Sequence, residues 1–268
     1  MRILLFLLSS LVLASCSSLP EPQMNPVEPH LKVVTYNVNW GGNKADLVAR
    51  YLIESDADII FLQETHKAWE KYLKHFLAAK YPHAEFKHSR GAGGIAFFSK
   101  YPLHDVKLIK PQAGWFPGLK ARVETKLGAI QLLNVHLKPP LSDTGSVSLS
   151  AYYQTQFIHK AELKELLAEF DPEQPLIIAG DFNENEDKAG IQSVMKRGFE
   201  SALLNFDDES PTWKWNLSYG LSWSDRYDHL IYNKFLRCTG AQVKDIPASD
   251  HFPVMAVFTK EKPNTGAE

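Results

Sequence analysis

The chain has 268 residues, of which 44% are hydrophobic and 22% are charged. This balance is that of an ordinary globular protein, and it excludes a disordered, collagen-like or coiled-coil chain. Its 29 Lys and Arg against 31 Asp and Glu give a net charge of -2, so no basic excess indicates a nucleic-acid partner.

The first fifteen residues are predicted to be an export signal. Arg2 is followed by an apolar run that ends at small residues and is too short for a membrane-spanning helix. The tetrapeptide Leu13-Ala14-Ser15-Cys16 resembles the lipobox of bacterial lipoproteins, which implies cleavage before Cys16 and lipidation of that residue. The alternative is a plain secretory signal with an incidental cysteine. We expect a lipid-anchored protein of the bacterial cell envelope, at the outer membrane or in the periplasm.

The rest of the chain is expected to hold a single folded domain. Residues 16–30 contain the lipidated Cys16 and a proline-rich stretch without apolar periodicity, which predicts an extended tether. Residues 31–260 contain no Pro/Gly-rich break and are predicted to be one domain, followed by a polar tail over 261–268.

Short apolar runs and helical stretches follow one another along this domain. The predicted strands are LKVVTYNV, DIIFLQE, GGIAFFS, ARVETKL, AIQLLNVHL, PLIIAGDF, YDHLIY and PVMAVF. The predicted helices lie at about residues 44–55, 66–80, 149–170 and 187–197. Some strands follow helices and others follow turns, so the order favours an α/β fold in which two mixed sheets pack face to face with helices outside.

Polar or acidic residues stand where several of these apolar runs stop. They are Asn37, Glu64, His136, Asp181 and Asn183, with Asp250 and His251 just before the last run. Taken singly, each has an ordinary explanation as a turn former, a helix cap or a surface acid. Because polar groups at strand ends gather at one sheet edge, where clefts form, the whole set predicts a site assembled from distant segments.

The residue types at these strand ends point to metal-assisted chemistry on phosphate. Glu64, Asp181 and Asp250 are hard oxygen donors of the kind that hold Mg²⁺. The sequence lacks the His-x-x-x-His and Cys-x-x-Cys spacings of a zinc site. His136 and His251 lie among acids that would keep an imidazolium charged, which suits the negative charge of a reacting phosphate.

Seven motifs resemble, in order, those of the endonuclease/exonuclease/phosphatase superfamily. They are TYNV, LQET, GGIAFFSKYPL, NVHL, AGDFN, RYDHLIY and SDHFPV, and together they cover about residues 31–258. This superfamily includes deoxyribonuclease I-like nucleases, exonuclease III-type repair enzymes, neutral sphingomyelinases and inositol polyphosphate 5-phosphatases. The resemblance implies a four-layer α/β-sandwich and divalent-metal-dependent phosphoester hydrolysis by in-line attack of water on phosphorus.

The resemblance also implies a role for each matching residue. The metal ligands would be Asn37, Glu64 and Asp250, with Mg²⁺ as cofactor and Mn²⁺ as a substitute. The catalytic residues would be His136, Asp181, Asn183, Asp228 and His251. Asp181 would activate water and Asn183 would hold the phosphate. His251, paired with Asp228, and His136 would stabilise the charge of the transition state. Family members differ over whether the histidine or the aspartate is the base, and we assign Asp181.

Substrate choice depends on segments outside these motifs. Residues 211–226 hold three of the six tryptophans, Trp213, Trp215 and Trp223, whose rings could stack on bases, rest on lipid headgroups or pack a long loop onto the sheet edge. We predict that Arg90, Trp213 and Arg226 contact substrate, although solvated surface charge also explains the two arginines.

Three hypotheses for the function follow. The first is an anchored, monomeric, Mg²⁺-dependent nuclease or general phosphodiesterase, whose partner is nucleic acid. The second is a lipid or small-molecule phosphohydrolase of the sphingomyelinase or inositol-phosphatase kind. The third is a catalytically inactive surface binding protein, against which the complete set of site residues argues. We favour the first.

Overall fold

The computed structural model of the chain describes residues 19–142, 144–146, 149–207, 209–216 and 218–261. The predicted export signal over residues 1–15, the lipidation site Cys16 and almost all of the polar tail lie outside the described residues. Within the described part, no helix is both long and apolar enough to cross a membrane.

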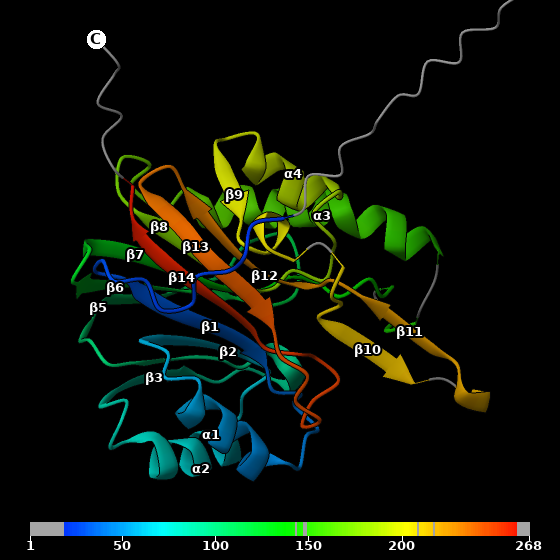
Figure 1. Cartoon of the computed structure of the whole chain (residues 1–268). Coiled ribbons are helices and arrows are strands. Elements are labelled where there is room, and N and C mark those ends of the chain that lie inside the picture. Colours follow the sequence, from blue (N-terminus) through cyan, green and yellow to red (C-terminus); the bar gives the residue numbers. More distant parts are fainter. Residues whose placement is uncertain (1–18, 143, 147–148, 208, 217, 262–268) are drawn as a thin grey trace, which may run out of the picture.

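Two six-stranded mixed sheets form the centre of the molecule (Figure 1). The first contains β1 (Leu31–Asn37), β2 (Ile59–Gln63), β3 (His83–Lys87), β4 (Ile95–Ser99), β13 (Leu236–Val243) and β14 (Val254–Lys260). The second contains β5 (Leu103–Ile109), β6 (Gly118–Thr125), β7 (Gly128–His136), β8 (Leu176–Asp181), β9 (Phe199–Ser201) and β12 (Asp228–Asn233). Their orders are β13-β14-β1-β2-β4-β3 and β5-β6-β7-β8-β12-β9.

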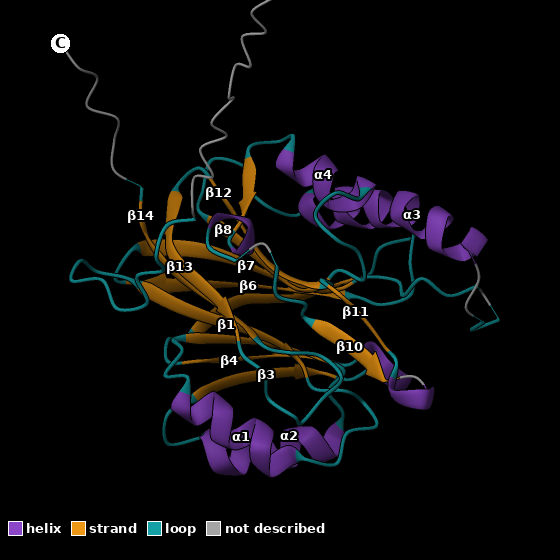
Figure 2. Cartoon of the chain, turned by 45° about the vertical axis from the view of Figure 1, so that its right-hand side comes forward, coloured by secondary structure: helices purple, strands orange, loops and turns teal. Residues whose placement is uncertain are grey.

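The helices cover the outer faces of the two sheets, as Figure 2 shows. They are α1 (Ala45–Glu54) and α2 (Lys67–Leu77) on the first sheet, and α3 (Leu149–Leu167) and α4 (Ala189–Met195) on the second. Short 3-10 turns lie at Gly91–Gly93, Leu203–Asn205 and Ser218–Gly220. The predicted fold class, a four-layer α/β-sandwich with mixed sheets inside, is confirmed.

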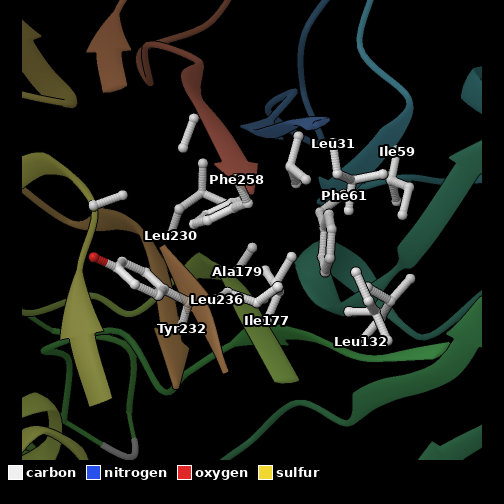
Figure 3. Close-up of a cluster of buried hydrophobic side chains, with 14 of the residues drawn as sticks. Leu31, Ile59, Phe61, Leu132, Ile177, Ala179, Leu230, Tyr232, Leu236 and Phe258 are labelled. Carbon is white, nitrogen blue, oxygen red and sulfur yellow. The ribbon is translucent and has the colours of Figure 1, made fainter. Parts of the chain in front are cut away.

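Strand alternation explains why one strand can serve two cores. In β1, Leu31 and Val33 face the other sheet, whereas Val34 and Tyr36 face α1 and α2. Between the sheets, Phe61 meets Phe97 edge to face with ring centroids 4.9 Å apart. Figure 3 shows this apolar layer, to which both sheets contribute side chains. Burial on both faces is why these strands have continuous apolar sequences.

Strand register brings the ends of several strands to one edge of the sandwich. β1 and β2 are parallel, with Asn37 opposite Gln63, so Glu64 follows directly beside Asn37. β7 and β8 are also parallel, with His136 opposite Asp181. β12 runs antiparallel to β8 and begins at Asp228, opposite the same aspartate. The carboxyl ends of four strands and the beginning of a fifth therefore meet.

Several strands were not predicted. They are the four edge strands of the two sheets, β3, β5, β9 and β13. Each is partly polar in sequence, because one side of an edge strand is exposed. The predicted long loop over residues 211–226 is instead a hairpin of β10 (Trp213–Asn216) and β11 (Ser222–Asp225), which projects beyond the sandwich (Figure 1).

The proline-rich stretch before β1 also differs from the prediction. Gln23 exchanges two hydrogen bonds with Thr239 of β13, one from its backbone N–H at 2.8 Å and one to its carbonyl at 3.1 Å. A Cβ on Gly240 would crowd the backbone of Gln23, so glycine permits the contact. Glu28 pairs with Arg237 of the same strand. The described part of this stretch therefore lies along β13 instead of extending as a free tether.

Gly180 is the residue of β8 that links the sheet to its polar edge. Its φ is +148°, and a Cβ there would overlap the backbone of Val135 in β7. We expect Gly180→Ala to lower the free energy of unfolding by more than about 3 kcal/mol, because the strands must separate. Gly198→Ala, also at positive φ but with open space, should cost only about 1–2 kcal/mol. Urea unfolding measures both, and equal losses would contradict this account of Gly180.

Candidate active site

All eight of the predicted catalytic and metal-binding residues lie at the edge where these strand ends meet. Asn37 and Glu64 come from the first sheet, and His136, Asp181 and Asp228 come from the second. The others lie on the adjoining segments and are Asn183, Asp250 and His251.

Asn37 lies between two carboxylates. Its Nδ2 donates to Glu64 Oε1 and to Asp181 Oδ2, each at 3.0 Å, while its Oδ1 accepts from the backbone N–H of Asn39 at 3.0 Å. The second oxygen of Glu64 accepts from the backbone N–H of Trp40 at 2.7 Å. Two acids from different sheets are thus held side by side by N–H donors.

The turn that carries Glu64 depends on a close backbone approach. Glu64 has φ +60°, and the next N–H, that of Thr65, donates to Gly94 O at 3.0 Å. A Cβ on Gly94 would overlap the carbonyl of Thr65. The second glycine of GGIAFFS, Gly94, therefore permits this turn, which places the Glu64 carboxylate beside Asn37.

His136 is oriented by a carbonyl and by an aromatic ring. Its Nδ1 donates to Ala92 O at 3.2 Å, and its ring stacks on Phe116 with centroids 4.4 Å apart. This leaves Nε2 facing Asp181 Oδ2 at 3.5 Å and Glu64 Oε1 at 3.9 Å. Phe116 was missed in the sequence, because nothing in its neighbourhood indicates a contact with the end of β7.

His251 and Asp228 form a buried pair on the other side of Asp181. His251 Nδ1 donates to Asp228 Oδ2 at 2.8 Å, and His251 Nε2 lies 3.7 Å from Asp181 Oδ2. Burial lowers the pKa of His251, but the negative charges of Asp228, Asp181 and Asp250 outweigh burial and hold that pKa above its ordinary value. His251 is therefore a positively charged donor at neutral pH.

Asn183 is fixed by the strand ends around it. It has φ +51°, its backbone N–H donates to Asp181 Oδ1 at 2.9 Å, and its Nδ2 donates to Leu137 O at 3.0 Å. The N–H of Leu137 in turn donates to Asp181 O at 2.9 Å. Asp181 and Asn183 consequently keep a set position relative to the end of β7.

The hairpin of β10 and β11 begins beside His251. The N–H of Lys214 donates to Asp250 O at 2.9 Å, and the N–H of Phe252 donates to Thr212 O at 2.6 Å. Thr212 Oγ1 also accepts from the backbone N–H of Asp228 at 2.8 Å. Thr212 was missed in the sequence, since its role depends on three segments that meet only in the fold.

Asp250 lies at the exposed rim of the site. Its Oδ1 accepts from Asn39 Nδ2 at 2.7 Å and its Oδ2 accepts from Trp213 Nε1 at 3.3 Å. Trp213 is half-buried and stacks on Tyr227, with centroids 5.1 Å apart. Both residues therefore lie at the rim of the site and contact each other. Metal binding by Asp250 and substrate contact by Trp213 stay predictions.

The two predicted substrate arginines lie in different surroundings. Arg226 is only 7% exposed, and its guanidinium donates to Ser210 O at 3.2 Å and to Glu186 Oε1 at 3.3 Å. Internal partners hold this guanidinium, and substrate contact by Arg226 stays a prediction. Arg90 is exposed and precedes the turn whose Ala92 carbonyl holds His136, so its contact with substrate stays a prediction.

The donor set fits a hard divalent cation. One oxygen of Glu64, one of Asp181 and Nε2 of His136 lie within 4.8 Å of one another. Two carboxylate oxygens in so small a space are the ligands that Mg²⁺ and similar ions prefer. Asn37 turns its oxygen toward Asn39, so its amide would have to turn over to serve as a third oxygen ligand.

We compared the chain with known protein families and solved structures. The family described as Endonuclease/Exonuclease/phosphatase matches residues 34–251. No curated protein matches the sequence.

Solved structures share the fold at low sequence identity. An endonuclease/exonuclease/phosphatase from Beutenbergia cavernae has a TM-score of 0.70 and 19% identity, covering 87% of this chain and 72% of its own. An AP endonuclease from Archaeoglobus fulgidus has a TM-score of 0.65 and 20% identity, covering 85% and 99%. D. rerio TDP2 complexed with a single-strand DNA product has a TM-score of 0.68 and 18% identity, covering 87% and 100%.

The charge state of His251 gives a direct test of the buried pair. We expect Asp228→Asn to lower the pKa of His251, because it removes the nearest negative charge while burial continues to disfavour the cation. An NMR titration of the His251 ring in the presence of a chelator measures this pKa. Asp245→Asn, at an exposed acid, is the matched control and should leave it unchanged. Identical His251 titrations in wild type and Asp228→Asn would contradict the assignment.

Proposed function

This chain belongs to the endonuclease/exonuclease/phosphatase family, and on that basis we propose that it is a divalent-metal-dependent phosphodiesterase that acts on nucleic acid. The observation that supports this most is the position of Asp181, whose Oδ2 lies within 4 Å of both His136 and His251. Two structural neighbours, an AP endonuclease and TDP2 complexed with a single-strand DNA product, support nucleic acid as substrate.

Asp181 and the side chains around it each have a separate role in the proposed hydrolysis. Asp181 accepts a proton from the attacking water as the new P–O bond forms in line with the bond that breaks. The charged His251, oriented by Asp228, donates from Nε2 to a non-bridging oxygen of the phosphoryl group, and this stabilises the charge that develops there. The leaving oxygen departs on the opposite side of phosphorus and takes a proton from solvent.

Asn183 and Glu64 have the remaining roles in the proposed site. Asn183, held by Leu137 O, is placed to orient the phosphate. A divalent cation held by Glu64 and Asp181 would supply positive charge to the phosphoryl oxygens.

Hydrolysis assays on the purified protein test this proposal. We would offer plasmid DNA, RNA, bis-p-nitrophenyl phosphate and sphingomyelin vesicles, each with Mg²⁺, with Mn²⁺ or with EDTA. The expected result is EDTA-sensitive cleavage of DNA or RNA. Asp181→Asn should lower turnover by about 10²–10⁴-fold, the usual contribution of a general base.

Asp187→Asn is the matched control, because Asp187 lies on the same loop with its side chain exposed. Full activity in EDTA would refute the metal dependence, and full activity of Asp181→Asn would refute the assigned base.

A second candidate is hydrolysis of a membrane phospholipid, and the projecting hairpin favours it. Trp215 is 51% exposed, Leu221 64% and Trp223 43%. The hairpin from 213 to 225 carries one Lys and one Asp, so it offers little positive charge to a nucleic-acid backbone. Neutral aromatic rings are typical of surfaces that rest in a lipid headgroup layer. Cleavage of sphingomyelin vesicles with DNA and RNA left intact would establish this candidate instead.

We also propose that the protein is lipid-anchored in the bacterial cell envelope, from the lipobox-like segment that ends at Cys16. Cys16→Ser should move the protein from the membrane fraction to the soluble fraction, because one acylated cysteine would carry all of the lipid. Fractionation followed by immunoblotting measures this, with Cys238→Ser at the buried cysteine as control. An unchanged membrane fraction would refute the anchor.

A further inference from the structure

We propose that helix α3 positions the active site through two buried side chains, His159 and Glu162, which hold the segment after β7 and the loop after β8 in place. This inference rests on the proposed function, because the residues it positions are Asp181 and Asn183. His159 and Glu162 lie three residues apart and therefore on one face of the helix, the face that meets these two segments.

His159 joins the two segments directly. It is 1% exposed, its Nε2 donates to Lys138 O at 2.7 Å, and its Nδ1 donates to Glu184 Oε2 at 2.8 Å. A carbonyl and a carboxylate both only accept, so both ring nitrogens must carry a proton. The charge of Glu184 outweighs burial and raises the pKa of His159, which agrees with a charged ring.

Glu184 passes the contact on to the next helix. It follows Asn183 directly and is buried, and its other oxygen accepts from the backbone N–H of Ile191 at 2.5 Å. The loop that carries Asn183 is therefore tied at one point to α3 and at another to α4. The loop is also held from β12, where His229 Nε2 donates to Glu184 O at 2.9 Å, so α3 supplies one of several contacts that set its path.

Glu162 holds the same backbone unit as His159 from its other end. Glu162 Oε2 accepts from the N–H of Lys138 at 3.3 Å, whereas His159 donates to the carbonyl of that residue. Both polar groups of one peptide residue are thus bound by one helix face. A Cβ on Gly114, which has φ +80°, would overlap Glu162 Oε1, so glycine is needed where the loop before β6 passes the carboxyl.

The position of Lys138 sets that of the site through Leu137. The N–H of Leu137 donates to Asp181 O, and the carbonyl of Leu137 accepts from Asn183 Nδ2. A shift of this segment would move the proposed base and the phosphate-orienting amide together. Small displacements of reacting groups cost about 10²-fold in rate, so such a contact affects turnover without touching substrate.

A buried ion pair is weak evidence for stability by itself, because well-packed apolar residues often stabilise a core as well or better. Apolar side chains in place of His159 and Glu184 would fill the space but would remove the bonds that these two residues make to Lys138 O and to the N–H of Ile191. Their contribution is to fix two loops relative to each other, which is a positioning role.

Steady-state kinetics of His159→Gln, Glu184→Gln and the double variant test the proposal. We expect kcat to fall about 10–100-fold in each single variant with KM within about twofold, because positioning of the reacting groups is lost. The double variant should lose less than the product of the two single losses, since both variants remove the contact between His159 and Glu184. His75→Gln, at an exposed histidine on α2, should retain wild-type kcat.

Glu162 provides a second, milder pair of variants. Burial raises the pKa of Glu162 to about 7, so a neutral amide is a close replacement that keeps an acceptor for the N–H of Lys138. Glu162→Gln should therefore retain most of kcat, whereas Glu162→Leu, of similar size but without an acceptor, should lose about tenfold or more.

Amide hydrogen exchange at Leu137 supplies a readout that does not depend on activity. Exchange should quicken in His159→Gln and Glu162→Leu, but not in His75→Gln or Glu162→Gln. A folded His159→Gln variant with wild-type kcat and unchanged Leu137 exchange would overturn the proposal, as would a rise in KM alone. Absence of hydrolysis by the wild type would refute the proposed function, while the exchange measurement would still decide the positioning role.

Discussion

The crowding of negative charge at one sheet edge is the constraint on which this structure depends. Four acids from distant parts of the chain end here: Glu64 lies near His136, Asp228 and Asp250 lie near His251, and Asp181 lies near both. Carboxylates this close repel one another unless donors or cations lie between them. The fold supplies donors from both sheets, namely the amide of Asn37, backbone N–H groups after β1 and β8, and the charged ring of His251.

Asp181 stands at the centre of this arrangement because it belongs to both halves of the site. Toward the first sheet it shares Asn37 with Glu64, which is the half that fits a cation. Toward the second it faces His251, whose charge is set by Asp228. Its backbone is fixed by Gly180, which lets β7 and β8 approach closely. One aspartate thus couples the oxygen-rich side of the site to the imidazolium side.

The strands of the core and the residues of the site could be predicted because both have local signals. Runs such as LIIAGD are apolar throughout, and the polar residue at the end of each run marks where burial stops. Family resemblance added roles to positions such as His251 and Asp228. The edge strands β3 and β5 have polar residues on their exposed side, so they lack the continuous apolar run that identified the others.

What could not be predicted depends on contacts between residues far apart in the chain. Arg226 resembles a surface cation until Glu186, 40 residues away, is seen to bind it. The type of Asn37 is plain from the sequence, but which end of its amide faces the acids is decided by the N–H of Asn39 and by Asp181. The ordered stretch on β13 has a proline-rich composition typical of a tether, and only the pairing of Gln23 with Thr239 shows otherwise.

That pairing has a geometric consequence for an anchored protein. With Gln23 bonded to β13, only residues 17–22 separate the folded body from Cys16. Seven extended residue steps span at most about 25 Å, which is less than the thickness of a lipid bilayer with its headgroups. A folded domain on so short a linker would stay within a thin layer of solution next to the membrane. The molecules that it could meet would then be those present at the membrane surface.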